Sequence, residues 1–300
     1  DSVFLESTGQ NNPTNYSNSI RINSGSIFLD GNHPTGINNI ALGNAAGSSL
    51  GAGALDNTLI GNAAGQNVST GTRNTVVGAG ACSNVLGTVV NNTAVGFNAL
   101  KNAGSSPGSG DWNVAIGDEA GLSITSGRQN VIMGNSAGTW LNGTGSTAIG
   151  FEAGNNFPNT GSNNVYLGYR AGNNITSGSS NTILGSGATA SSATVNNEVT
   201  LGNSSVTTLR CQVTSITALS DARDKKDVED ANIGLDFIND LRPVKFVWDT
   251  RDGAKKDIKE VGFIAQELDE VQQKHGVEDH LQLVLKNNPD KLEASQGKLI

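Results

Sequence analysis

A short motif built on glycine recurs ten times along the chain at a nearly constant interval, and it constrains the fold more than any other feature. Each copy contains Asn, a residue such as Thr or Val, two mostly apolar residues, Gly, two variable residues, Ala and usually a second Gly, as in Asn39–Gly47. The first glycines of the motif are Gly43, Gly61, Gly78, Gly96, Gly117, Gly134, Gly150, Gly168, Gly185 and Gly202, at intervals of 18, 17, 18, 21, 17, 16, 18, 17 and 17 residues. Such an array is typical of a stacked repeat fold.

Each copy predicts one coil of a β-solenoid. It is too short for a pair of helices, and four or five residues of Thr, Val, Ile or Leu bounded by Gly favour a short strand. Alternate side chains of a strand point to the same side. We expect the inward positions to include Ile40, Leu42, Leu59, Val76, Ala94, Val114, Ile116, Ile132, Ala148, Val165, Leu167 and Ile183.

The composition supports a thin, β-rich assembly. The chain of 300 residues contains 39 Gly, 36% hydrophobic and 5% aromatic residues, too few bulky side chains for a thick core over most of its length. Disorder is the competing interpretation, but apolar residues recur at fixed places. Small inward residues would leave a single coil unable to shield itself, which favours stacking and trimerisation.

The Asn that opens each copy has two interpretations. It can form a ladder with the Asn of the next coil, which would satisfy buried amide groups along the stack. It can equally reflect the ordinary preference of Asn for turns.

Charged residues mark a boundary before residue 220. Of the 46 Lys, Arg, Asp and Glu residues, 15 lie in residues 1–219 and 31 in residues 220–300. We predict a β connector over residues 1–37, a solenoid shaft over 38–219 and a small α+β domain over 220–300. The predicted fold class is therefore mainly β, with a trimeric β-roll or β-solenoid shaft followed by that α+β domain.

Two flanking segments of the shaft also contain strand patterns. The alternating runs Ser19–Ile22 and Ser26–Leu29 predict a β-hairpin or two successive coils. A strand over Val206–Val213 is expected to close the shaft. The chain starts with Asp1, which suggests a fragment of a longer protein, and we expect the α+β domain to be truncated at its C-terminus.

Several function classes are disfavoured. Six basic and nine acidic residues give −3 for residues 1–219, and 13 basic and 18 acidic residues give −5 for the rest, so neither part offers the basic face that nucleic acids require. No apolar run is long enough to span a bilayer, and the first residues do not form a signal peptide. No metal or cofactor is expected, and Cys82 and Cys211 are interpreted as small apolar fillers of the shaft.

The C-terminal domain is predicted to alternate helices and strands. We expect a helix over Ile233–Leu241, which stops before Pro243, and a second helix over Gln266–Lys274. Strands are expected over Val244–Trp248, over Val261–Ala265 as a buried strand, and around Leu281–Leu285. The aromatic residues Phe237, Phe246, Trp248 and Phe263 are expected to form a small core.

The boundary itself carries a hydroxyl and an amine five positions apart, Ser220 and Lys225. A serine becomes a nucleophile when a base removes its proton, and a neutral lysine can be that base. The neighbouring cations Arg223 and Lys226 favour the neutral amine. Most often, however, such a pair is a helix cap next to a solvated side chain.

Three ordered motifs decide between these interpretations: Ser220–Val228, Gly234–Trp248 and Val261–Leu268. They resemble the endosialidase-type intramolecular chaperone and autoprotease domain found at the end of phage tail fibres and tailspikes. The resemblance implies that three copies template a trimeric shaft and are then released by cleavage. It also implies Ser220 as the nucleophile, Lys225 as the base and Leu219–Ser220 as the cleaved bond. Asp224, where many members carry an apolar residue, could pair with Lys225 and keep it protonated.

The repeats resemble the heads of trimeric autotransporter adhesins, through stretches such as Asn92–Gly96 and Ser146–Gly150. That resemblance implies a trimer with loops facing outward. Exposed aromatic residues on these loops, Trp112, Trp140, Phe157 and Tyr169, could stack on sugar rings, although packing within the loops is the default interpretation.

We therefore predict a homotrimeric tail fibre of the phage type, made in the host cytoplasm, located on the virion and used for host attachment. Its expected partners are its own copies and a host-surface glycan or protein receptor. Enzymatic activity would be limited to one self-cleavage by a serine–lysine pair. The alternative is a bacterial trimeric surface adhesin without proteolytic activity. A glycan hydrolase is disfavoured, because Glu152 and the Asp118–Glu119 pair resemble turn residues.

Overall fold

The computed structural model of the chain describes residues 19–23, 26–30, 36–85, 87–104, 110–212, 220–231, 233–251, 253, 255–286 and 292–294. By its internal contacts the chain divides into two units, residues 1–203 and residues 204–300. The first contains a β-solenoid and the second is a small α+β unit, which confirms the predicted mainly β solenoid followed by an α+β domain. The limit predicted at residue 219 falls within 213–219, outside the described residues, so the predicted domain limits stay a prediction.

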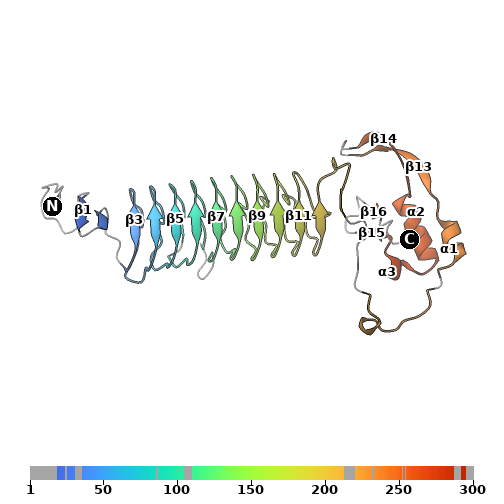
Figure 1. Ribbon diagram of the computed structural model, residues 1–300, viewed down its shortest axis with the longest axis horizontal. Helices are drawn as coiled ribbons and strands as arrows, with labels where there is room; N and C mark the ends of the chain where they lie inside the picture. The colour runs from blue at the N-terminus through green and yellow to red at the C-terminus, as the bar shows by residue number, and fades with distance from the viewer. Residues whose placement is uncertain are drawn as a thin grey trace. The chain divides into compact units, whose positions relative to one another are not determined.

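Ten short strands stack in one parallel sheet, in the order in which they occur along the chain (Figure 1). They are β3 (Ile40–Leu42), β4 (Thr58–Ile60), β5 (Thr75–Val77), β6 (Thr93–Val95), β7 (Val114–Ile116), β8 (Val131–Met133), β9 (Thr147–Ile149), β10 (Val165–Leu167), β11 (Thr182–Leu184) and β12 (Val199–Leu201). Each strand ends immediately before a motif glycine, as predicted. The strands β1 (Ser19–Asn23) and β2 (Ser26–Asp30) pair antiparallel, which confirms the hairpin interpretation.

Of the three residues of each strand, only the middle one points into the solenoid interior. Leu59, Val76 and Ile132 are fully buried there, as predicted. The prediction was wrong for six apolar residues that lie at the first or third strand position and point outward: Ile40, Leu42, Val114, Ile116, Val165 and Leu167. Because side chains alternate along a strand, these residues flank the buried Ala41, Ala115 and Tyr166, two of which are too small to stand out in the sequence.

The glycine after each strand allows adjacent rungs to come close together. Gly43 has φ +134°, and a Cβ atom at this position would lie 2.5 Å from the carbonyl oxygen of Gly61 in the next rung. The same contact continues from Gly61 to Gly78. A residue with a side chain would therefore have to separate the rungs, which explains why glycine recurs at this position.

The Asn residues at the start of the motif form a ladder inside the stack. Asn57 Nδ2 donates to Asn39 Oδ1 over 2.9 Å and to the Gly71 carbonyl over 2.8 Å, and Asn57 Oδ1 accepts from the Asn74 backbone N–H over 3.0 Å. The pattern continues along the shaft, with Ser146 in one rung and Glu198 in the last. The ladder interpretation is confirmed, because these buried amides bond one another and the backbone of the next rung, with the exception of Asn92 Nδ2, which has no partner in the described residues.

Large and small residues complement each other in the core. A glycine in the left-handed conformation follows the buried Ala of most rungs, as at Gly65, where a Cβ atom would lie 2.7 Å from Leu59 Cδ2. Where the strand residue is instead Ala94, the equivalent position holds Leu100, which is fully buried despite φ +49°. At this rung the space beside the small strand residue is thus filled from the turn.

Cys82 occupies the same turn position beside Val76 and is buried, as predicted, and burial raises the pKa of its thiol to about 12. The prediction was wrong for Cys211, which is exposed. Residues 206–212 form no strand, contrary to the expected closing strand Val206–Val213. The last strand of the stack is therefore β12.

The described residues of the second unit form a short 3-10 helix, three α-helices and two small antiparallel sheets. They are η1 (Ala222–Asp224), α1 (Leu235–Asp240), β13 (Val244–Asp249), β14 (Lys256–Gly262), α2 (Ala265–Lys274), α3 (Glu278–Leu281), β15 (Val284–Leu285) and β16 (Glu293–Ala294). Both predicted helices and the strand at Val244 are confirmed. The core consists of Phe237, Leu268, Leu283 and Val284, with partly buried neighbours such as Phe263.

Three predictions for this unit were wrong in part. The expected buried strand Val261–Ala265 is the end of the largely exposed β14, and α2 already begins at Ala265. The expected strand Leu281–Leu285 is divided between α3 and β15. Phe246 and Trp248 pack edge to face on β13, with ring centroids 5.1 Å apart, and lie outside the core cluster.

The filling of the shaft core can be tested with Ala94 and Leu100. Ala94→Leu alone should lower the free energy of unfolding by about 1–3 kcal/mol, because Leu100 already occupies the space. Adding Leu100→Gly recreates the Leu59 and Gly65 arrangement and should recover most of that loss. Urea unfolding of both single variants and the double variant measures the coupling. If the changes in unfolding free energy of the two single variants simply add in the double variant, Leu100 does not fill the space beside Ala94.

Candidate functional site

The two predicted catalytic side chains, Ser220 and Lys225, contact each other at the start of the C-terminal segment. Lys225 Nζ donates a hydrogen bond to Ser220 Oγ over 2.7 Å. The 3-10 helix η1 reverses the chain between them, and the Lys225 backbone N–H donates to the Ala222 carbonyl over 3.2 Å. A five-residue step in an extended chain would span about 17 Å, so this turn is what brings the hydroxyl and the amine together.

Asp221 stabilises the turn and holds a neighbouring cation. Its carboxylate accepts from the Arg223 backbone N–H over 2.9 Å, which caps η1, and forms an ion pair with the Arg223 guanidinium over 2.6 Å. These hydrogen bonds, first from the Arg223 side chain and then from its backbone, lower the pKa of Asp221. Asp221 therefore remains an anion bound to Arg223, and Lys225 faces Ser220.

The interaction expected between Asp224 and Lys225 is not formed in the described residues, where no hydrogen bond or ion pair joins the two side chains. The Lys225 amine is directed to Ser220 instead. Both Ser220 and Lys225 are exposed in the single chain. Leu219, the residue on the other side of the predicted cleavage bond, lies outside the described residues, and the catalytic roles of Ser220 and Lys225 stay a prediction.

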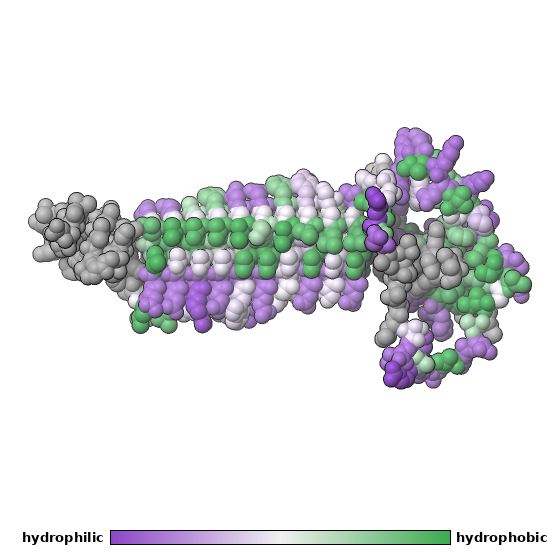
Figure 2. Space-filling view, viewed as in Figure 1, coloured by the Kyte–Doolittle hydropathy of each residue, from purple (hydrophilic) through white to green (hydrophobic). Residues whose placement is uncertain are grey.

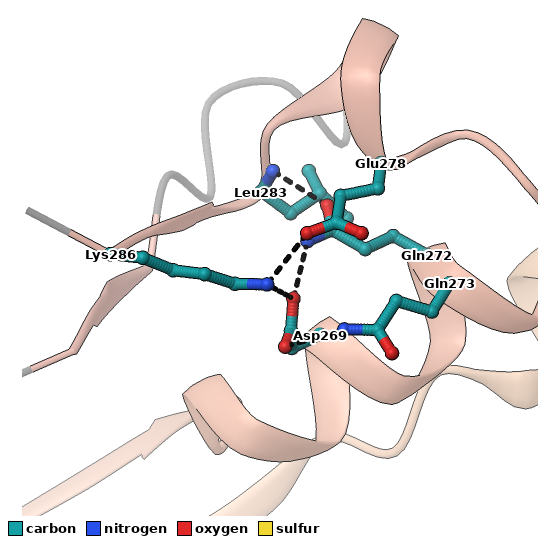
Figure 3. Close-up of polar contacts among 6 residues, drawn as sticks. All are labelled: Asp269, Gln272, Gln273, Glu278, Leu283 and Lys286. Atoms are coloured by element: carbon teal, nitrogen blue, oxygen red, sulfur yellow. Dashed lines mark hydrogen bonds and ion pairs between the residues drawn. The ribbon is translucent and has the colours of Figure 1, made fainter. Parts of the chain in front are cut away.

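A second polar cluster lies within the α+β unit and surrounds the fully buried side chain of Gln272 (Figure 3). Gln272 Oε1 accepts from the Leu283 backbone N–H over 2.9 Å, and Gln272 Nε2 donates to Asp269 Oδ1 over 2.8 Å. Lys286 Nζ completes the cluster through ion pairs with Asp269 over 2.7 Å and Glu278 over 2.6 Å. These contacts connect α2 to α3 and to the segment that forms β15.

The charges in this cluster stabilise one another. Partial burial raises the pKa of Asp269, but hydrogen bonds from Lys286 and Gln272 and the charge of Lys286 lower it, and the net shift is downward. The carboxylates of Asp269 and Glu278 in turn raise the pKa of the Lys286 amine. Lys286 and Asp269 therefore stay ionised at neutral pH, and their ion pair ties the end of the β15 segment to α2.

A third cluster connects α1 to α2. Asp240 accepts from Lys274 Nζ over 2.8 Å and contacts His275 Nε2 over 2.6 Å, and these two hydrogen bonds lower the pKa of Asp240. The His275 ring also packs edge to face on Phe237, with centroids 5.3 Å apart. The apolar core and the polar surface of the unit therefore meet at this histidine.

Sequence reasoning identified the contact between Ser220 and Lys225 but missed the cluster around Gln272. The spacing of Asp269, Gln272 and Gln273 along one helix face was a usable signal, because residues three and four apart are neighbours on a helix. The participation of Lys286 was not predictable, since it depends on how the chain returns after α3.

Within the described ranges, no group of three or more His, Cys, Asp or Glu side chains is placed to hold a metal ion. Glu119 and Glu152 lie in turns with positive φ, and Glu152 forms an ion pair with Arg170. The part of the chain that the structure describes contains no helix with the length and apolar character needed to cross a bilayer.

The importance of Gln272 can be tested with its neighbour as a matched control. Gln272→Leu leaves the buried Leu283 N–H without its acceptor and should lower the free energy of unfolding by about 1–3 kcal/mol. Gln273→Leu removes an exposed hydrogen bond to the same Asp269 and should change the free energy of unfolding by less than about 0.5 kcal/mol. Hydrogen exchange at the Leu283 amide should quicken in the first variant alone. Equal effects of both substitutions would contradict this role.

The comparisons with known proteins agree with the geometry of this segment. Residues 220–277 match the family model described as the chaperone of endosialidase, Peptidase_S74, and the match starts at Ser220 and includes Lys225. Searches of curated proteins and of solved structures gave no significant match. The resemblance inferred from the three sequence motifs is confirmed over that range. A β-solenoid followed by a chaperone segment of the endosialidase type suggests a phage tail-fibre-like protein.

Proposed function

We propose that this protein is the shaft of a homotrimeric viral fibre for host attachment, with a C-terminal chaperone that templates trimer folding and cleaves itself before Ser220. The observation that carries the proposal is an uncharged outer face on the stacked strands. The match of residues 220–277 supports it over the bacterial surface adhesin.

The outer face consists of the first and third residues of all ten strands. The third residue is apolar in every rung: Leu42, Ile60, Val77, Val95, Ile116, Met133, Ile149, Leu167, Leu184 and Leu201. The first is β-branched in every rung, namely Thr, Val or Ile. These residues form a column of hydrophobic side chains along the stack (Figure 2), and Leu42, Met133 and Leu167 are 41%, 41% and 47% exposed in the single chain.

Such a face is unusual for a soluble monomer. Parallel sheets are normally covered on both faces, and a contiguous apolar patch of this length marks an interaction surface. Other copies of the same chain are the partner that fits, because their columns have the same spacing and can match rung for rung over the whole stack. The chaperone match supports a three-fold arrangement, and the sequence resemblance to trimeric adhesin heads favours the same number of copies.

The α+β unit also supports self-association. Its core of four buried residues is small, while Leu235, Val247 and Val261 are 77%, 54% and 61% exposed. A two-stranded hairpin such as β13–β14 is only marginally stable by itself. Contacts with the same unit in other copies would cover these side chains and bring three shafts together at one end.

A charge in the outer column should block trimer formation. Met133→Lys combined with Leu167→Lys places two ammonium groups per chain in the proposed interface, whereas Gln129→Lys adds one at an exposed turn position. Light scattering of purified chains should give a trimer for wild type and Gln129→Lys and a monomer for the double variant. A monomeric wild type at micromolar concentration, or a double variant that remains trimeric, would disprove the proposed interface.

The proposed self-cleavage uses the hydrogen bond between Lys225 and Ser220. The amine, in its neutral form, takes the Ser220 hydroxyl proton as Oγ attacks the Leu219 carbonyl carbon, and the protonated amine returns that proton to the departing Ser220 nitrogen. Water then hydrolyses the ester that links Leu219 to Oγ. Burial favours a neutral amine, and both side chains are exposed in the single chain, so we expect cleavage after assembly.

Cleavage can be read on a denaturing gel. Wild type should yield pieces of 219 and 81 residues, while Ser220→Ala and Lys225→Ala should remain intact, because each removes one reacting group. Lys226→Ala is the control: it removes the adjacent amine and should still cleave. If all four proteins run at the full-length position, self-cleavage is wrong for this chain, and the trimer measured by light scattering is unaffected by that result.

The same proposal places the protein on the virion, after synthesis in the host cytoplasm, with a host-surface glycan or protein as its receptor. The exposed turns of the shaft are rich in Asn, Ser and Thr, and they are the parts of a stacked fold that vary most freely in length and composition. Receptor contact would therefore be made at these turns, on the sides of the stack that the strands leave open.

A further inference from the structure

One pair of aromatic side chains on the turns of the shaft is exposed and belongs to no core. Trp140 and Phe157 lie edge to face, with ring centroids 4.7 Å apart and an interplanar angle of 67°. They are 36% and 68% exposed. After the strand residue and the motif Ala, each rung from β3 to β11 has a third buried residue, which is Leu141 in the rung of Trp140. The position directly before this residue holds Ser or Asn in six other rungs: Ser49, Asn67, Asn84, Asn102, Ser123 and Asn174. The tryptophan is therefore a departure from the repeat.

Phe157 is also a departure from the repeat, because its turn is longer by two residues. Gly138 and Leu141 are separated by two residues, whereas the equivalent Gly154 and Asn159 are separated by four. The register of the stack is nevertheless kept, since Leu141 and Asn159 pair as a parallel bridge. The additional residues therefore bulge outward and place Phe157 next to Trp140.

The bulge is held firmly by its own side chains. Asn159 Nδ2 donates to the Gly154 carbonyl over 3.0 Å and closes the turn, and Asn156 Nδ2 donates to the Ile175 carbonyl of the next rung over 3.2 Å. The Phe157 backbone N–H donates to Asn156 Oδ1 over 3.0 Å. A surface fixed in this way loses little conformational entropy when a ligand binds.

The surroundings of the pair are polar but uncharged. The turn segments of four successive rungs, residues 121–127, 138–145, 154–161 and 172–178, contain Asn, Ser, Thr and Gly and no Asp, Glu, Lys or Arg. Amide and hydroxyl groups offer both donors and acceptors, and the exposed ring faces offer apolar contact. The C–H faces and hydroxyl groups of a neutral sugar match this combination, whereas these four segments supply no cation for an acidic sugar and the nearest arginine in the sequence, Arg128, follows the first of them.

A second aromatic pair on the shaft lacks these properties and serves as a control. Phe151 and Tyr169 are stacked nearly parallel, with centroids 5.4 Å apart and an angle of 9°. The Arg170 guanidinium lies 5.3 Å from the Tyr169 ring and pairs with Glu152. The facing surfaces of this pair are occupied by each other, and charges lie beside it.

We propose that the Trp140–Phe157 pair and the turns around it form a binding site for a neutral saccharide. The inference rests on the proposed role in host attachment and specifies the chemistry of the receptor. Trp140 and Phe157 would contact the sugar ring, and the Asn, Ser and Thr side chains of the neighbouring rungs would contact its hydroxyl groups, directly or through water.

The test is binding of the full chain to an array of immobilised neutral and acidic oligosaccharides and bacterial surface polysaccharides. Wild type should bind neutral members. Trp140→Ala and Phe157→Ala should each weaken that binding at least about tenfold, as expected for central aromatic contacts. Phe151→Ala and Tyr169→Ala should leave it unchanged. Light scattering on the same samples checks assembly, and Phe157→Ser replaces Trp140→Ala if the latter does not fold.

Three results would overturn the proposal: no binding to any neutral glycan, binding to acidic glycans alone, or equal losses in both aromatic pairs. The last would point to a general effect on the shaft. A protein that is trimeric but binds no neutral glycan would refute the saccharide site and leave the trimeric shaft in place. A monomeric wild type would instead refute the proposed function itself.

Discussion

Each rung of the shaft completes its hydrogen bonds on the next rung. The Ile40 N–H donates to the Asn57 carbonyl over 2.7 Å, and the Gly61 N–H donates to the Leu42 carbonyl over 2.8 Å. A chain that relies on such bonds must return to the same place after every turn, which explains the nearly constant interval between glycines. It can lengthen only where the additional residues bulge outward, as they do before Asn159, because any other insertion would move the following strand out of register.

This dependence also leaves the outer edges of β3 and β12 without a paired strand among the described residues. The Asn ladder shows how the last rung differs. Asn181 Oδ1 accepts from the Glu198 N–H over 2.9 Å, but the Glu198 carboxylate accepts hydrogen bonds from Ser191 and Thr200 instead of continuing to another rung. An amide has both a donor and an acceptor and suits the interior of a ladder, whereas a carboxylate only accepts and suits its end.

Each rung is thin, and its interior has no room for all the apolar side chains of its strand. Its interior takes one strand residue, the Ala of the motif and one or two turn residues. In one rung the turn residue Leu100 provides the volume that the strand residue Ala94 lacks. The remaining apolar residues of the strands must point outward. The shaft therefore has a packed interior of its own and a second apolar face, which other copies cover in the proposed trimer. The α+β unit has the same combination of a small core and exposed apolar residues.

Local patterns in the sequence were sufficient for the periodic part of the protein. The glycine interval predicted ten strands and their ends, the two helices before and after Pro243 were predicted within two residues, and the motifs after residue 220 indicated the chaperone segment. The approach of Lys225 to Ser220 also follows from local chain geometry, because one turn between neighbours is enough to form it. What the sequence left undecided was the direction of side chains and the contacts between distant segments. Leu42 and Leu59 look alike in the sequence, yet one points outward and the other inward, because only the folded rung defines which strand position is the middle one. The contact between Lys286 and Asp269, and that between Phe157 and Trp140, join residues 17 positions apart, and both depend on the path of the chain in three dimensions, which no local propensity encodes.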